Sequence, residues 1–246
     1  MKHFCAIALL LSTLFSPAHA DVLPLKIAVV SYTSPFVMQG NNQFYGFDIA
    51  MMTYICPIIQ RSCEYQVMEF SELLPAVAAN KVDIAISGIT ITPSRAKIVN
   101  FSIPYLVSET RFLGRSALAA FPFSLSMLQK SKFGVQTGTV FNEEILSLGL
   151  ENPSISNFQE ESDLIEAVTD GTVDIVLVDQ ATAMYWQGHS AGKLVALRQP
   201  IPYGYGFGIA VSGNEPELLK SINQAVVQYQ NSNDFKTNIL MYMKYF

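Results

Sequence analysis

A charged side chain stands at the end of an apolar run, where it could bind a ligand. Asp179 follows the run at 174–178, which places it at the carboxyl edge of a predicted sheet, where α/β proteins bind ligands. Its carboxylate could there pair with a cationic group such as an ammonium ion. It could equally cap the helix predicted to begin at Gln180. The residues alone leave both interpretations open.

Arg95 lies just after a predicted helix start. Thr92 and Pro93 are the cap and first-turn residues of an ordinary helix, but this role does not explain Arg95. A guanidinium group stays charged and offers two parallel donors to a carboxylate. A surface arginine needs no such partner, so the carboxylate-binding role is one of two interpretations.

The segment 136–139, Gln-Thr-Gly-Thr, follows a predicted strand and precedes a predicted helix. Backbone N–H groups exposed in such a turn suit an anion. A plain glycine turn with a threonine cap is the alternative interpretation of this segment.

The elements that carry these residues indicate an α/β protein. Short runs rich in Ile and Val alternate with segments of helical length, which is typical of βαβ units and mainly parallel sheets. The predicted strands are 25–30, 83–87, 132–136, 174–178 and 206–211. The predicted helices are 48–60, 71–79, 93–98, 143–148, 161–169, 215–231 and a segment from 234 onward.

Two irregular segments divide this pattern into lobes. The pattern breaks after Tyr105 and again in the Pro- and Gly-rich segment 200–206. If 108–111 and 200–203 are hinge crossings, residues 112–199 form a second lobe inserted into a discontinuous first lobe. That first lobe consists of 21–107 and 204–246, and a cleft lies between the two lobes.

The first twenty residues are typical of an export signal. A short charged start at Lys2 precedes an apolar run at 4–15, and Ala18-His19-Ala20 is a small-x-small cleavage site. We therefore expect cleavage near Ala20 and a soluble mature protein in the periplasm. An uncleaved membrane anchor is the alternative, whereas Cys5 precedes the apolar run and is no lipoprotein cysteine.

Charge and cysteine content exclude two classes of function. The net charge is −5, so the chain lacks the excess of basic residues that nucleic-acid binding requires. Cys56 and Cys63 are the only cysteines after the signal, and no histidine cluster accompanies them. We expect no metal site and no cofactor.

Four motifs occur in order along the chain, at 46–49 (Gly-Phe-Asp-Ile), 70–75, 83–97 and 101–105. Together they resemble the polar amino-acid-binding proteins of bacterial ABC importers, which include arginine-, histidine-, glutamine- and lysine-arginine-ornithine-binding proteins. The resemblance covers essentially the whole mature chain. It implies a two-lobed periplasmic-binding-protein fold of type II. It also implies that the protein is a monomer and carries a free amino acid to an importer permease in the inner membrane. A cationic ligand such as arginine is favoured, with glutamine or another polar amino acid as the alternative.

The resemblance also assigns roles to residues of this sequence. Arg95 matches the arginine that pairs with the substrate α-carboxylate, and Thr139 completes that clamp from the other lobe. Asp179 matches the partner of the α-ammonium group. Further ligand contacts are implied for Phe70, Ser87, Gly88 and Thr90, and a disulfide is implied between Cys56 and Cys63.

The chain departs from the family pattern where the ligand side chain is recognised. Val30 stands where members that bind cationic side chains can present an acid. Thr33 stands where an aromatic residue is usual, and Tyr32 is its neighbouring substitute. These departures leave the side-chain specificity open.

Two rival functions use the same scaffold. Cyclohexadienyl dehydratases resemble these receptors, but elimination needs a general acid or base poised in the cleft. Glu69, Asp179 and His189 are the conceivable candidates, and they show no paired constellation. We therefore predict a protein that is not an enzyme. The other rival is the sensor module of a receptor or the front half of a wall-cleaving enzyme.

Overall fold

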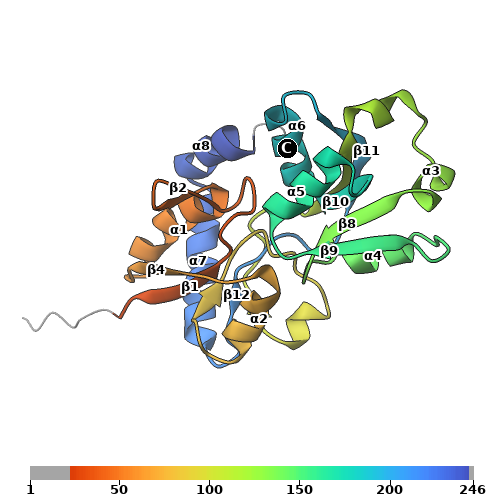
Figure 1. Cartoon of the computed structure of the whole chain (residues 1–246). Helices are drawn as coiled ribbons and strands as arrows, with labels where there is room; N and C mark the ends of the chain where they lie inside the picture. The colour runs from red at the N-terminus through yellow and green to blue at the C-terminus, as the bar shows by residue number, and fades with distance from the viewer. Residues whose placement is uncertain (1–22, 244–246) are drawn as a thin grey trace, which may run out of the picture.

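The structure is a computed structural model, and it describes residues 23–243. The predicted signal peptide and its cleavage near Ala20 lie outside the described residues. In the described part, the chain builds two five-stranded sheets. Each sheet is covered by helices, and Figure 1 shows most of the first lobe at the lower left and the second lobe at the upper right.

The first lobe contains the sheet with the strand order β4-β1-β5-β12-β6. Strand β1 pairs parallel with β4 and β5, and β12 pairs antiparallel with β5 and β6. The strands are β1 (Leu25–Val29), β4 (Cys63–Val67), β5 (Ile84–Ala85), β6 (Asn100–Phe101) and β12 (Ala210–Val211). The other elements are the hairpin β2 (Met38–Gly40) and β3 (Gln43–Tyr45), and the helices α1 (Phe47–Ile58), α2 (Phe70–Ala78), η1 (Arg95–Lys97), α7 (Pro216–Gln230) and α8 (Asn233–Tyr242).

The second lobe contains the sheet with the strand order β11-β7-β10-β8-β9. Its strands are β7 (Glu109–Arg115), β8 (Lys132–Gln136), β9 (Ser154–Phe158), β10 (Ile175–Asp179) and β11 (Leu194–Pro202). Its helices are η2 (Ser116–Ala120), α3 (Leu125–Gln129), α4 (Phe141–Ser147), α5 (Glu161–Asp170) and α6 (Gln180–His189). Residues 175–178 of β10 are all buried, because helices cover both faces of this central strand.

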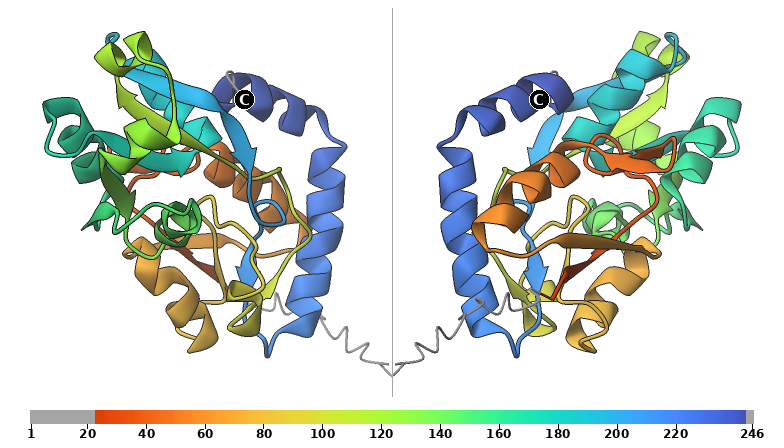
Figure 2. Two further views of the ribbon diagram at one scale, coloured as in Figure 1. Left: turned by 90° about the vertical axis from the view of Figure 1, so that its right-hand side faces the viewer. Right: turned by 90° about the vertical axis from the view of Figure 1, so that its left-hand side faces the viewer.

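The chain passes between the lobes twice. It leaves the first sheet after β6 and enters the second at β7, and it returns between β11 and β12. The two passages run side by side, since Glu109 pairs with Pro202 and Thr110 with Ile201. The α/β class and the two-lobed fold are therefore confirmed, whereas the boundaries at 108–111 and 200–203 stay predictions. Figure 2 shows α7 along the first lobe and α8 reaching toward the second.

Three predicted elements are clearly shorter than expected, and the first of them is the strand 83–87, which pairs only at Ile84–Ala85. The predicted helix 93–98 is a single 3-10 turn, Arg95–Lys97, because the chain must enter β6 three residues later. Thr92 does begin this turn, as its hydroxyl accepts a hydrogen bond from the Arg95 N–H at 3.2 Å. The predicted strand 206–211 pairs regularly only at Ala210–Val211, and Phe207 adds isolated bridges to Thr90 and Leu106.

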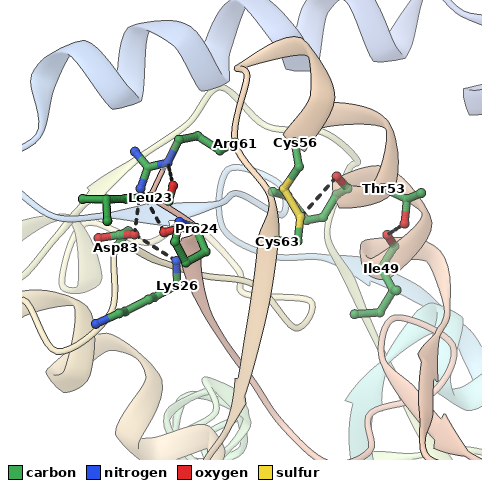
Figure 3. The surroundings of a disulfide bond; sticks show 10 residues. Leu23, Pro24, Lys26, Ile49, Thr53, Cys56, Arg61, Cys63 and Asp83 are labelled. Carbon is green, nitrogen blue, oxygen red and sulfur yellow. Dashed lines mark hydrogen bonds and ion pairs between the residues drawn. A yellow bond between two sulfur atoms is a disulfide. The ribbon is translucent and has the colours of Figure 1, made fainter. Parts of the chain in front are cut away.

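The predicted disulfide between Cys56 and Cys63 is present. It joins the last turn of α1 to the first residue of β4 (Figure 3). Beside it, Arg61 forms an ion pair with Asp83 at 3.5 Å. Neither cysteine lines the cavity between the lobes, so this bond stabilises the edge of the first lobe, not the candidate site.

Among the described helices, none has both the length and the apolar composition needed to cross a bilayer.

Candidate ligand-binding site

A small cavity of about 20 Å³ lies between the lobes. The first lobe contributes Thr33, Phe70, Gly88, Thr90 and Arg95, and the second lobe contributes Gln136, Thr139, Val140, Phe141, Glu161, Leu164, Val178, Asp179 and Thr182. The structure therefore brings together all the predicted site residues except Tyr32 and Ser87. Segments far apart in the sequence supply these side chains: Thr33 follows β1, Phe70 follows β4, Thr90 follows β5, Thr139 follows β8, and Asp179 ends β10.

Arg95 is held in place by contacts to both lobes. Its side chain is 8% exposed, its Nη1 donates to the Thr90 carbonyl at 2.8 Å, and its Nη2 donates to the Gly138 carbonyl at 3.0 Å. The guanidinium carbon lies 5.6 Å from the centre of the Phe70 ring. Burial lowers the pKa of Arg95 to about 10, and the nearby Asp179 opposes this shift. Arg95 therefore stays charged, and its remaining N–H groups are free to bind an anion.

The Gly138 turn of the second lobe touches the first lobe closely. Gly138 has φ +82°, and a Cβ atom there would lie 2.6 Å from the Cα of Ser71. Only glycine permits both this backbone conformation and this approach. The next residue, Thr139, donates its hydroxyl to the Gln136 carbonyl at 2.6 Å, which fixes the conformation of this turn.

Asp179 occupies the N-cap position of α6, but its side chain makes no capping hydrogen bond. The helix-cap interpretation therefore does not account for its carboxylate, which lines the cavity instead. Burial and the nearby Glu161 raise the pKa of Asp179, and Arg95 lowers it. Within the described residues, the ion pairs are Arg61–Asp83 and Arg115–Asp174. Arg95 and Asp179 thus bring a guanidinium and a carboxyl group to one cavity without pairing with each other.

The segment around Gly88 is organised by a buried acid. The Gly88 N–H donates to the carboxylate of Asp48 at 2.8 Å, and the Tyr105 hydroxyl donates to the same oxygen at 3.1 Å. Burial raises the pKa of Asp48 to about 6. Because this bond occupies the Gly88 N–H, the polar group that Gly88 can offer a ligand is its carbonyl. The Ser87 hydroxyl accepts the Val30 N–H at 3.1 Å and supports the loop from behind the cavity.

Tyr32 belongs to a contact between the lobes and does not line the cavity. Its hydroxyl donates to the Tyr185 hydroxyl at 3.2 Å, and its ring lies 6.3 Å from that of Trp186. Thr182 adds a hydrogen bond from its hydroxyl to the Ser34 carbonyl at 2.6 Å. The segment 31–34 therefore closes against the start of α5 and α6.

Glu161 is a cavity residue that the sequence analysis missed. It is 3% exposed and accepts hydrogen bonds from the Thr33 hydroxyl, the Ser34 N–H and hydroxyl, and the indole N–H of Trp186, at 2.6–3.2 Å. Burial raises the pKa of Glu161, and these hydrogen bonds oppose the shift. The sequence offered no signal for it, because the strand β9 that precedes it was not predicted and its partners Thr33 and Ser34 come from the other lobe.

The remaining candidates for acid–base chemistry lie away from the cavity. Glu69 forms a capping box with Glu72 at the start of α2. His189 stacks on Tyr185 with ring centres 4.0 Å apart. Residues 23–243 contain no cluster of three or more His, Cys, Asp or Glu side chains that could hold a metal ion. The cavity thus offers one guanidinium group, from Arg95, and two carboxyl groups, from Asp179 and Glu161.

Comparison with known proteins decides the family. The sequence profile of the bacterial extracellular solute-binding proteins, family 3, matches residues 25–246. The chain belongs to this family. The match extends over both lobes, so no separate module accounts for either of them.

Three similar proteins illustrate the range of this family. The ABC transporter arginine-binding protein 1 of Escherichia coli (strain K12) is 28% identical over 230 residues, which are 92% of each chain. A crystal structure of an arginine transport-system periplasmic binding protein from Legionella pneumophila has a TM-score of 0.80 at 27% identity, covering 91% of this chain and all of the other. The ancestral amino acid-binding protein AncCDT-1, described as a precursor of cyclohexadienyl dehydratase, has a TM-score of 0.79 at 26% identity, covering 89% and 95%.

Proposed function

We propose that the protein is a periplasmic receptor that binds a free L-amino acid and delivers it to the permease of an ABC importer. The observation that carries this proposal is the pair of unpaired opposite charges, Arg95 and Asp179, which line one cavity from opposite lobes. A free amino acid is the ligand that needs both, a guanidinium for its carboxylate and a carboxylate for its ammonium group. The arginine-binding relatives make arginine the first ligand to test.

Binding is coupled to movement of the lobes in this proposal. The Gly138 N–H would add a donor to the carboxylate, and the Thr90 hydroxyl and Gly88 carbonyl would complete the contacts from the first lobe. Because the ligand touches both lobes only when they are closed, it stabilises the closed conformation over the open one. The hinge lies in this proposal at 108–111 and 200–203. The closed monomer in the periplasm is then the form that the permease recognises.

An enzyme of the cyclohexadienyl dehydratase type is the second candidate. It is favoured by the similarity to AncCDT-1, whose description links an amino acid-binding protein to that enzyme. Asp179 is the single cavity residue among the three side chains considered for acid–base catalysis. Glu69 and His189 do not line the cavity, so the receptor is the better supported proposal.

Thermal unfolding in the presence of ligands tests the receptor function. The mature protein is unfolded and refolded to remove bound ligand, and its Tm is recorded with individual L-amino acids, ornithine and prephenate. A ligand at a thousand times its Kd stabilises the folded state by about 4 kcal/mol, which raises the Tm by roughly 8–16 °C for a chain of this size.

The set of responding ligands decides between the candidates. A rise in Tm with one amino acid or a few related ones supports the receptor. A response to prephenate, accompanied by formation of its dehydrated product, would favour the enzyme. If no amino acid changes the Tm, the proposed function is wrong.

A further inference from the structure

The cavity between the lobes has an uneven charge balance. Of the residues that line it, only Arg95, Asp179 and Glu161 carry formal charge. Arg95 contributes one positive charge, and the two carboxylates contribute two negative charges. When all three are ionised, the cavity therefore has a net charge of −1, and a ligand with a net charge of +1 would neutralise it.

Glu161 is the charge that a neutral amino acid would leave unpaired. The carboxylate and ammonium groups of such a ligand would satisfy Arg95 and Asp179. All four hydrogen bonds to Glu161 come from uncharged donors, and in the described part of the chain it forms no ion pair. A buried carboxylate without a cation is costly, and a ligand with a cationic side chain would supply the missing counter-ion.

Glu161 lines the same cavity as Arg95 and Asp179. It is the first residue of α5, and Asp179 is the N-cap residue of α6, so both carboxylates reach the cavity from helix starts of the second lobe. An amino acid with its carboxylate on Arg95 and its ammonium group on Asp179 would therefore have Glu161 within the same cavity as its side chain.

One carboxylate oxygen of Glu161 retains capacity for a ligand. Its Oε1 accepts three hydrogen bonds, two from Ser34 and one from Trp186. Its Oε2 accepts only the Thr33 hydroxyl, at 3.1 Å, and a carboxylate oxygen has two lone pairs. The bonds to Oε1 fix the orientation of the side chain, and they leave an acceptor site on Oε2.

From this arrangement we infer that Glu161 selects a cationic side chain, so that the receptor prefers arginine, lysine or ornithine to neutral amino acids. The inference rests on the proposed amino-acid receptor function. The selecting acid comes from the second lobe, through the first residue of α5. The first lobe presents the uncharged Val30 and Thr33 at the corresponding end of β1.

The test compares L-arginine with L-citrulline, which replaces the guanidinium by a neutral urea group of the same shape. Isothermal titration calorimetry should show that the unmodified protein binds arginine at least about 30-fold more tightly than citrulline. Glu161→Gln keeps the size and an acceptor for Ser34 and Trp186 but removes the charge. It should weaken arginine binding about 30-fold and change citrulline binding less than about threefold.

Two further variants serve as controls. Glu160→Gln removes the adjacent charge, which bonds to Ser31 at 3.0 Å and does not line the cavity, and it should leave the preference for arginine unchanged. Glu161→Asp keeps the charge and should retain the preference with lower affinity.

Several results would overturn the inference. If Glu161→Gln lowers the affinity for arginine and for citrulline equally, Glu161 is only a structural contact between the lobes. If the unmodified protein binds arginine and citrulline with equal affinity, Glu161 has no selective role, and this result holds even if the variant does not fold. Binding of neutral amino acids alone would refute the inference and leave the receptor function standing. Binding of no amino acid would refute both.

Discussion

Replacing Gly138 with alanine should keep both lobes folded and prevent their full closure. The added Cβ atom would lie 2.6 Å from the Ser71 Cα of the opposite lobe, and ordinary contact begins at 3.4 Å. The lobes would therefore have to separate by about 0.8 Å at this point. The hydrogen bond from Arg95 to the Gly138 carbonyl, now 3.0 Å long, would be stretched beyond a useful length.

The size of the effect follows from that bond. A hydrogen bond to a charged group contributes about 1.5–3 kcal/mol, so the affinity for the amino-acid ligand should fall about 10- to 100-fold. The left-handed backbone of an alanine adds about 1–2 kcal/mol of strain, which lowers the Tm of the free protein by roughly 2–8 °C. Calorimetric titration measures the first effect and thermal unfolding the second.

Gly149→Ala is the matched control for this experiment. Gly149 also has a positive φ, +74°, but no atom lies within 4 Å of its Cβ position. It should show the same loss of Tm with unchanged ligand affinity. If Gly138→Ala binds its ligand as tightly as Gly149→Ala does, the close approach of the lobes has no part in binding, and the reasoning fails.

Three further predictions follow from the site and its surroundings. Arg95→Lys keeps the charge but loses the two parallel donors. Titration calorimetry should therefore show an affinity at least about tenfold lower for every amino-acid ligand. A loss of affinity for only one type of ligand side chain would contradict the proposal that Arg95 binds the ligand carboxylate. Replacing both Cys56 and Cys63 by serine should lower the free energy of unfolding by about 2.5 kcal/mol in urea titrations without changing ligand affinity. The pKa of Asp48 is about 6 in the folded state, above its ordinary 3.8. The protonated Asp48 therefore stabilises the folded state below pH 4, and this stabilisation is lost as the pH rises through 6. Asp48→Asn should therefore reduce this loss by about 3 kcal/mol, as measured by urea unfolding at several pH values, and an unchanged pH profile would count against the buried charge.

The sequence predicted the elements whose own residues determine them. The apolar run that forms β10 and the periodic helices α5 and α7 lie within a few residues of their predicted positions. Strands β7, β9 and β11 were missed. Strand β9 lies at the edge of its sheet with largely exposed side chains, and β7 and β11 pair with each other across a long stretch of chain, so local composition carries little sign of them.

The same distinction applies to the site. Arg95 and Asp179 follow recognisable strand ends, and the family resemblance singled them out. Glu161 is buried because Thr33 and Ser34 of the other lobe cover it, and the contact to Ser34 joins residues 127 positions apart in the sequence. The sequence of α5 itself therefore gives no indication that Glu161 contacts Ser34. The resemblance also singled out Tyr32, whose hydroxyl donates to Tyr185 in the contact between the lobes, and its role at the ligand stays a prediction.

The small size of the cavity has a kinetic consequence. A space of about 20 Å³ holds roughly one water molecule, so no amino acid can enter the closed conformation. Ligand must associate with the open fraction of the molecules before the lobes close on it. The hydrogen bonds between Thr182 and Ser34 and between Tyr32 and Tyr185 join the two lobes, so they reduce the open fraction of the free protein without touching the ligand. Residues outside the cavity thereby set the association rate.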